Sequence, residues 1–258
     1  MEASMEKLEA GSGDVEMALE LQVNKSLSGA GAGQESKSSE EKSSHMSPSN
    51  QTSSSSMARQ HVIDQLEQAS SAEEIVRILK ELQRPENKGE MKQREIEIVI
   101  RAMGKKNVKA HQSSEDIQVL ACGILGDLAK TGPRLRVDIA KHKGIEAVLA
   151  AMRAHPAGQP VQQQACGALG SLAVNADNQV KIAGLGGIEA VLAAVKAFLS
   201  SEDLLPVALN LLACFSSKES KSLMRELGAG DLVSSAMKRF EQNAIIPNIG
   251  KIVLEWLQ

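Results

Sequence analysis

The cysteines and histidines are the residues of this chain best suited to nucleophilic chemistry or metal binding. They are Cys122, Cys166, Cys214, His45, His61, His111, His142 and His155. None of them shows the C-x-x-C or H-E-x-x-H spacing that gathers ligands around one zinc ion, and no G-x-S-x-G sequence presents a nucleophilic serine. We therefore expect no enzyme activity, no metal and no cofactor, and we expect the cysteines to be small core residues.

Two glycine-rich stretches could be mistaken for phosphate-binding loops. They are GAGAG at 29–33 and GLGG at 184–187. A dinucleotide-binding loop needs a strand before the glycines and a helix after them, and neither stretch follows a strand-like run. Nucleotide binding, in a regulatory or enzyme-associated subunit, therefore stays only as an alternative function.

An internal repeat is the strongest signal in the sequence. LACGILGDLA at 120–129 nearly recurs as QACGALGSLA at 164–173, and IAKHKGIEAVLAAMRAH at 139–155 recurs as IAGLGGIEAVLAAVKAF at 182–198. The two offsets are 44 and 43 residues. VALNLLACF at 207–215 follows QACGALGSL by the same distance, 43 residues. A period of this length is typical of stacked helical units.

The repeat divides the chain into units. Capping helices are predicted in 58–84, followed by four units at about 85–130, 131–174, 175–216 and 217–258. The first unit is diverged, and its EIEIVIRAM at 95–103 aligns with GIEAVLAAM at 144–152. Within a unit, apolar residues recur three and four positions apart, which is the spacing of amphipathic helices, and no alternating run suggests strands.

Several helix boundaries are marked by capping residues. Ser71 and Glu74 form a capping-box signature before an apolar run. Asn175 can cap a short helix, and the glycine pair Gly186–Gly187 interrupts the chain before the next one. These signals predict three helices in each unit.

Residues 1–57 differ in composition from the rest of the chain. They contain SKSSEEKSS at 36–44 and SSSS at 53–56, and they have no aromatic residue. Such a segment cannot bury enough apolar surface to offset the entropy of ordering, so a disordered tail is predicted. Its four Lys, eight Glu and one Asp give a net charge of −5, which leaves +2 of the chain total of −3 for residues 58–258.

Composition also restricts the partners. A nearly neutral body with no tyrosine and three phenylalanines has little of the positive charge or stacking surface that nucleic-acid binding requires. The sequence contains no run of about 18 apolar residues, so we expect no insertion into a membrane. Three unpaired cysteines fit a reducing compartment, so we expect a cytoplasmic or nuclear protein whose partner is a protein or peptide.

The repeating unit resembles that of the armadillo family. The family's unit has a short helix ending in a glycine pair, a second helix I-x-x-L-V/L-x-L-L, and a third helix A-A-x-A-L-x-N-L-A. The corresponding stretches are VKIAGLGGI at 180–188, IEAVLAAV at 188–195 and ACGALGSLA at 165–173. The resemblance covers about residues 85–258, with HEAT repeats as the nearest alternative. It implies an all-α, right-handed α-solenoid of armadillo-type repeats behind a disordered N-terminal tail.

The third helices of armadillo proteins line a concave groove, so the resemblance implies that exposed positions on these helices contact a partner. Those positions are Gly123, Asp127, Gly167, Ser171, Asn210, Cys214, Ile252 and Trp256. A run of glutamines could add hydrogen bonds at one edge of the groove. These are Gln159, Gln162, Gln163 and Gln164. Small residues would leave room for a helix that docks by its apolar face.

The resulting interpretation is a non-catalytic scaffold or adaptor that binds a peptide or helix of a partner protein in the groove. Nuclear transport is a second alternative, although the Trp and Asn that peptide-binding importins carry at these positions are missing. Trp256 leaves two interpretations open, an inward-packing cap or a contact for self-association. In the second, Ile249, Ile252 and Val253 would give the last helix an exposed apolar face.

Overall fold

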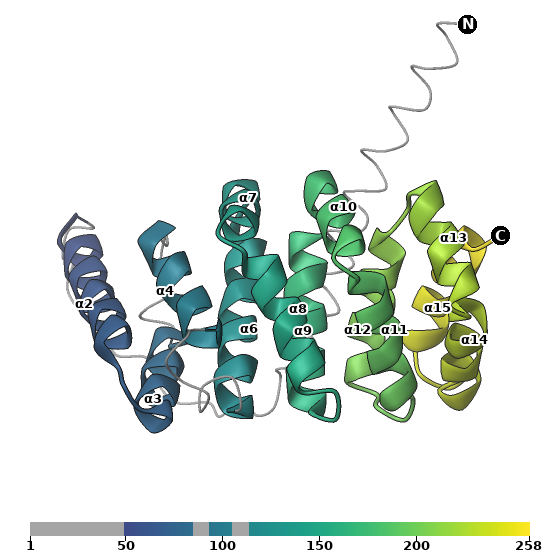
Figure 1. Ribbon diagram of the computed structural model, residues 1–258, viewed down its shortest axis with the longest axis horizontal. Helices are drawn as coiled ribbons and strands as arrows, with labels where there is room; N and C mark the ends of the chain where they lie inside the picture. Colours follow the sequence, from purple (N-terminus) through teal and green to yellow (C-terminus); the bar gives the residue numbers. More distant parts are fainter. Residues whose placement is uncertain (1–48, 85–92, 105–113) are drawn as a thin grey trace, which may run out of the picture.

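The chain folds into a stack of helices. The computed structural model describes residues 49–84, 93–104 and 114–258, and in these ranges it contains helices and no strand. Figure 1 shows an elongated array with α2 at one end and α14 and α15 at the other. The predicted all-α solenoid is therefore confirmed, whereas residues 1–48 of the predicted tail lie outside the described residues. The helices are α2 Ser49–Gln68, α3 Ala72–Leu82, α4 Gln93–Gly104, α6 Glu115–Thr131, α7 Pro133–Lys141, α8 Gly144–Ala154, α9 Gln159–Leu172, α10 Ala176–Gly184, α11 Gly187–Ala197, α12 Leu204–Cys214, α13 Lys218–Glu226, α14 Ala229–Arg239 and α15 Ile246–Trp256.

Helix α2 begins earlier than the sequence predicts. The predicted tail extends to residue 57, yet α2 starts at Ser49, so residues 49–57 are helical. Once a helix is nucleated, each further residue adds one hydrogen bond, so a helix can extend into a serine run that has no apolar pattern.

The ends of several helices are capped by their own side chains. The hydroxyl of Ser71 accepts a hydrogen bond from the Glu74 amide at 3.2 Å, and the Glu74 carboxylate accepts one from the Ser70 amide at 3.2 Å. Asn175 Oδ1 accepts from the Asn178 amide at 3.0 Å at the start of α10. These contacts satisfy amides that have no partner inside the helix, and they confirm the caps predicted at Ser71 and Asn175.

The turn between the first and second helices of each triplet uses the same backbone conformation. Lys143, Gly186 and Gly228 have φ angles of 67°, 79° and 73°, in the left-handed region. Glycine adopts this conformation easily, whereas a lysine there is strained. A Cβ on the following residue would also be too close, because at Gly187 it would lie 2.3 Å from Ile182 Cγ2. Both glycines of the pair Gly186–Gly187 therefore suit this turn, whereas the other two turns manage with one glycine each, in Lys143–Gly144 and Gly228–Ala229.

The helices form two main rows. Helices α3, α6, α9, α12 and α15 pack one after another, and we call them the inner row. Helices α4, α8, α11 and α14 form the outer row behind them. The short helices α7, α10 and α13 lie along one edge of the array (Figure 1).

The core lies between these rows, and small residues set the spacing of the inner helices. A Cβ at Gly126 on α6 would lie only 3.2 Å from Ala168 Cα on α9, so the two backbones come close here. The repeated Ala-Cys pairs face the same interior, and all four residues are fully buried. They are Ala121, Cys122, Ala165 and Cys166. This burial explains why the decapeptide of 120–129 recurs at 164–173, since each packed helix pair needs small residues.

Polar side chains connect consecutive units through main-chain carbonyls. Asn178 Nδ2 on α10 donates to the Arg136 carbonyl at 3.2 Å, and Lys181 Nζ donates to the Ala140 carbonyl at 2.7 Å. Both acceptors belong to α7, the corresponding helix of the preceding unit. These bonds fix the register between the unit that contains α10 and the unit before it.

Two glutamines attach the inner row to the outer row. Gln162 Nε2 donates to the carbonyls of Met152 at 2.7 Å and His155 at 2.8 Å. Gln118 Nε2 makes the equivalent bond to the Met103 carbonyl at 3.0 Å. Gln162 is 3% exposed, so it is an internal residue and does not contribute to the polar edge suggested by the glutamine run.

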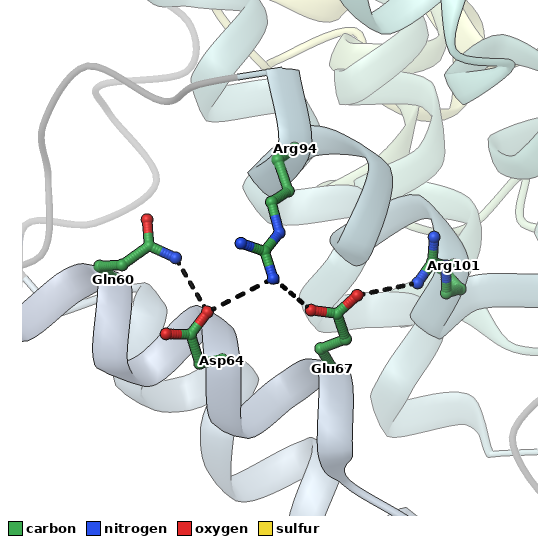
Figure 2. A network of polar contacts seen from close by, with 5 residues as sticks. All are labelled: Gln60, Asp64, Glu67, Arg94 and Arg101. Atoms are coloured by element: carbon green, nitrogen blue, oxygen red, sulfur yellow. Dashed lines mark hydrogen bonds and ion pairs between the residues drawn. The ribbon is translucent and has the colours of Figure 1, made fainter.

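The N-terminal end is held by charged pairs between α2 and α4. Figure 2 shows Arg94 of α4 between Asp64 and Glu67 of α2, with Arg101 on the other side of Glu67. The Arg94 Nη2 to Glu67 Oε2 distance is 2.6 Å. Nearby, Arg59 Nε lies 3.7 Å from Glu95 Oε2, and both of these side chains are buried.

Candidate protein-binding groove

Two amide side chains converge over Gly123 on the inner row. A Cβ at Gly123 would lie 3.0 Å from Gln83 Nε2 and 3.3 Å from Gln164 Oε1. Gln83 is the C-cap of α3, and Gln164 lies on α9. The missing side chain at Gly123 of α6 therefore lets the amide groups of Gln83 from α3 and Gln164 from α9 meet over α6. Amide groups both donate and accept hydrogen bonds, which suits the backbone of a bound peptide.

Three other predicted contact residues are accessible on the same row. Asp127 is exposed and accepts a bond from Lys130 Nζ at 3.0 Å. Gln163 and Gly167 on α9 are half-buried. A Cβ at Gly167 would meet Val207 Cγ1 of α12 at 3.7 Å, an ordinary contact, so the surface is open here.

Three further predicted contact residues are buried. Ser171, Asn210 and Cys214 are 2%, 9% and 7% exposed. Ser171 Oγ donates to the Gly167 carbonyl at 2.9 Å, and Cys214 Sγ donates to the Asn210 carbonyl at 3.4 Å. The helices α9 and α12 that carry them pack against neighbouring helices on both sides, and these neighbours cover the three side chains. A partner on the inner row would touch little of these three side chains.

Trp256 packs against its own unit. Lys221 Nζ of α13 lies 5.1 Å from the centre of the Trp256 ring, a cation–π distance. Arg225 Nε, also on α13, donates to the Leu257 carbonyl at 2.8 Å. The residues suggested for an exposed apolar face on the last helix do not form one, because Ile249 and Val253 are 2% and 1% exposed and Ile252 is half-buried.

The cysteines, the possible metal ligands and the GLGG stretch all have structural roles or surroundings that do not favour chemistry. Burial raises the pKa of the Cys122, Cys166 and Cys214 thiols to about 12, so their reactive thiolate forms are suppressed. Among the described residues no group of His, Cys, Asp and Glu could hold a metal ion. The GLGG stretch follows helix α10 and supplies the left-handed turn at Gly186.

A cavity of about 560 Å³ lies beside the outer row, and the sequence reasoning missed it. Ile100 of α4 and Ala147, Ala150 and Ala154 of α8 line its apolar part. Gln118 of α6 also borders it. The cavity is therefore formed between the first and second units, away from the convergence at Gly123.

Polar groups surround this cavity. His142 Nε2 lies 3.0 Å from Glu97 Oε1, and His142 Nδ1 donates to the Asp138 carbonyl at 2.7 Å. Glu146 Oε1 lies 3.1 Å from Lys181 Nζ, while Glu146 Oε2 is buried and has no hydrogen-bond partner in the described part of the chain. The strained Lys143 lies in the same lining. One sequence signal could have revealed the cavity, namely Gly104 at a position where the next unit carries Arg153.

Comparison with known proteins agrees with the fold. No known family model and no curated protein matches the sequence. A chain from structural work on a conserved phosphorylation switch, which controls the interaction between cadherin and beta-catenin, superposes with a TM-score of 0.64 at 15% identity over 81% of this chain and 43% of that one. An engineered protein from a structural genomics consortium superposes with a TM-score of 0.53 at 15% identity, over 81% and 92%. The chain thus spans less than half the length of the first protein.

The fold and these likenesses define the class of the molecule as an all-helical solenoid built from helical repeats. Within the described residues no helix is both long and apolar enough to cross a membrane.

Proposed function

We propose that the chain is a non-catalytic protein-binding scaffold with armadillo-type repeats, which holds a peptide or helix of a partner protein against the inner row. The convergence of Gln83 and Gln164 over Gly123 carries this proposal. It provides amide groups on the same row as the open surface at Gly167, and solenoids generally use such an elongated face for recognition. The neighbour from the cadherin and beta-catenin work comes from a protein–protein interaction, which supports the same function.

Two features support the assignment of the repeats to the armadillo type. The triplets have a short, a second and a third helix, for example α10, α11 and α12. A left-handed residue separates the first two helices in each of three triplets, at Lys143, Gly186 and Gly228. The three cysteines are free and buried, which supports a place in the reducing cytoplasm or nucleus.

Gly167→Arg is the variant that tests groove binding. The added side chain has an ordinary contact at its Cβ and replaces a helical glycine, so folding should be retained or slightly favoured. It places a long cation on the inner row, which should block a partner. Ala193→Arg, at an exposed position of the outer-row helix α11, is the matched control.

The two variants and the natural chain are compared as baits in cross-linking capture, followed by mass spectrometry and a binding titration with the purified partner. We expect a partner that is retained by the natural chain and by Ala193→Arg but lost with Gly167→Arg. Equal affinity of that partner for both variants would show that it binds elsewhere and would reject the inner row as the binding face.

A further inference from the structure

The cavity between α4 and α8 corresponds to a position that an arginine fills one unit later. Residues 95–103 align with 144–152, so Gly104 is equivalent to Arg153, 49 residues on. The structure supports this alignment, because the carbonyls of Met103 and Met152 accept the equivalent bonds from Gln118 and Gln162. At the next unit the position holds Lys196, so glycine is the exception among these three units.

Between α8 and α11 the arginine lies over the turn that joins α10 to α11. Arg153 Nη2 donates to the Leu185 carbonyl. A Cβ at Gly186 would lie 3.1 Å from this Arg153 nitrogen and 3.7 Å from Glu189 Oε2. The guanidinium group therefore occupies the space above the turn, beside a carboxylate from the first turn of α11.

The same turn exists one unit earlier, without an arginine above it. His142, Lys143 and Glu146 stand 43 residues before Leu185, Gly186 and Glu189. All three line the cavity of about 560 Å³, together with Gly104. The cavity thus lies where the side chain of residue 104 would run if that residue were arginine.

The charges in the cavity suit a cation. Glu146 Oε1 is paired with Lys181 Nζ at 3.1 Å, whereas Glu146 Oε2 is buried and has no hydrogen-bond partner within the described ranges, a costly state for a carboxylate oxygen. Glu97 supplies a second carboxylate, whose Oε1 lies 3.0 Å from His142 Nε2. Of the cations in the lining, Arg101 is already paired with Glu67 at 3.3 Å. Lys143 is exposed.

The walls suit the stem of a long side chain. Ile100, Ala147, Ala150 and Ala154 provide apolar surface along α4 and α8, and the methylene groups of arginine pack well on such surface. A planar guanidinium can also donate to a carbonyl and a carboxylate at once, which an ammonium does less well.

We propose that this cavity binds an arginine side chain of a partner protein, whose guanidinium takes the position that Arg153 occupies in the next unit and donates to Glu146 Oε2 and the His142 carbonyl. Every arginine of this chain lies in the described residues, and none occurs in 1–48, 85–92 or 105–113. The arginine ligand therefore comes from outside these 258 residues. This second site lies between α4 and α8 of the outer row and does not depend on groove binding.

The first test is a titration of the ¹⁵N-labelled full chain with N-acetyl-L-arginine methylamide. The citrulline analogue, which has the same shape without the charge, is the matched probe. We expect saturable shifts of the Lys143, Gly144 and Glu146 amides with an affinity of about millimolar, as for other small ligands. Citrulline should bind at least about tenfold more weakly, because it lacks the charged hydrogen bonds. Equal binding of the two probes would reject the proposal.

Variants locate the site. Gly104→Arg should fill the cavity with its own side chain, abolish probe binding and raise the melting temperature. Gly184→Arg is the control, because its Cβ also meets nothing within 4 Å but lies at the end of α10, and it should bind normally. Glu146→Gln should weaken binding about fivefold or more, through loss of one charged acceptor. Probe binding that survives in Gly104→Arg would overturn the assignment.

Two further outcomes separate this inference from others. Lys105, Lys106 and Lys109 follow Gly104 in the sequence. If the natural chain fails to bind the probe and the Lys105→Gln, Lys106→Gln, Lys109→Gln variant binds it, the occupant is the chain's own lysine and the proposal is wrong. Gly167→Arg, which tests the inner row, should leave probe binding unchanged.

Discussion

The middle of the solenoid and its N-terminal end are stabilised in different ways. In the middle, small and aliphatic residues pack closely, as at Gly126 and Ala168, and polar side chains such as Asn178 bind carbonyls of the adjacent unit. At the N-terminal end, α2 is attached to α4 by charge pairs, including the buried Arg59 and Glu95. The inner units therefore pack on their neighbours through complementary shapes that can be repeated along the chain. The end helix is instead positioned by specific side-chain pairs.

Breaking the buried pair should have the largest effect. Glu95→Ala leaves Arg59 buried, and its Nε and Nη1 already have no hydrogen-bond partner among the described residues. Burial lowers the pKa of Arg59, and the charge of Glu95 opposes that shift. We expect a loss of about 3–5 kcal/mol in the free energy of unfolding, measured by urea denaturation, because a buried charge loses its partner.

The double variant Arg59→Met, Glu95→Leu is the control for this prediction. Replacing both charges by apolar groups removes the uncompensated charge, so its stability should be close to that of the natural chain. A double variant as unstable as Glu95→Ala would show that packing, and not charge, dominates at this end.

Truncation of the repeated core should come next. Leu169→Ala removes a fully buried side chain, and the cavity should cost about 2–5 kcal/mol in the free energy of unfolding. Leu125 and Leu212, which occupy the equivalent places in α6 and α12, are also fully buried. Because the units repeat, alanine at these positions should cost a similar amount in the same denaturation experiment. A much smaller loss at Leu169 would contradict equivalent packing in the middle.

Relief of the strained turn should have a smaller effect, in the opposite direction. A non-glycine residue in the left-handed region costs about 1–2 kcal/mol, and Lys143 has a φ of 67°. Glycine also makes the unfolded chain more flexible, which offsets about 0.4–1 kcal/mol of the gain. Lys143→Gly should therefore stabilise the chain by about 0.5 kcal/mol, measured by thermal unfolding.

The helical Lys141 provides the control for this turn. Lys141→Gly in the last turn of α7 should destabilise the chain, because glycine is unfavourable in a helix. If both glycine variants destabilise the chain, the turn at Lys143 is not strained.

The exposed pair at the N-terminal end should give the smallest effect. The hydrogen bond from Arg94 lowers the pKa of Glu67. The stabilisation is therefore fully present above the unfolded carboxyl pKa and is lost as the pH falls through the lowered folded value. Arg94→Met should lower the melting temperature slightly at neutral pH, and not in acid or at high salt, where the pair is protonated or screened. A difference that persists in acid would rule out this pair as its cause.

Much of the fold could be predicted from the sequence because its determinants are local. The Ser71–Glu74 cap and the glycine pair at Gly186–Gly187 act within a few residues, and the repeat places the Ala-Cys pairs in the core. The start of α2 was not predictable, because its serine run has no apolar pattern.

The candidate sites depend on how neighbouring helices are rotated, which the sequence does not show directly. Ser171 and Cys214 belong to the predicted third-helix positions, yet neighbouring helices cover them. The convergence over Gly123 needs the C-cap of α3, which lies 40 residues earlier. The cavity arises from a missing side chain at Gly104, and only comparison with the next unit reveals such an absence.

The bonds from Asn178 and Lys181 to the preceding unit also have a mechanical consequence. Each of them joins only adjacent units, and no similar bond in the described ranges skips one. In a solenoid linked in this way, each repeat unit is held only by the units next to it. When its two ends are pulled apart, the molecule should therefore unfold one unit at a time. The remaining units stay folded while the unfolded segment lengthens.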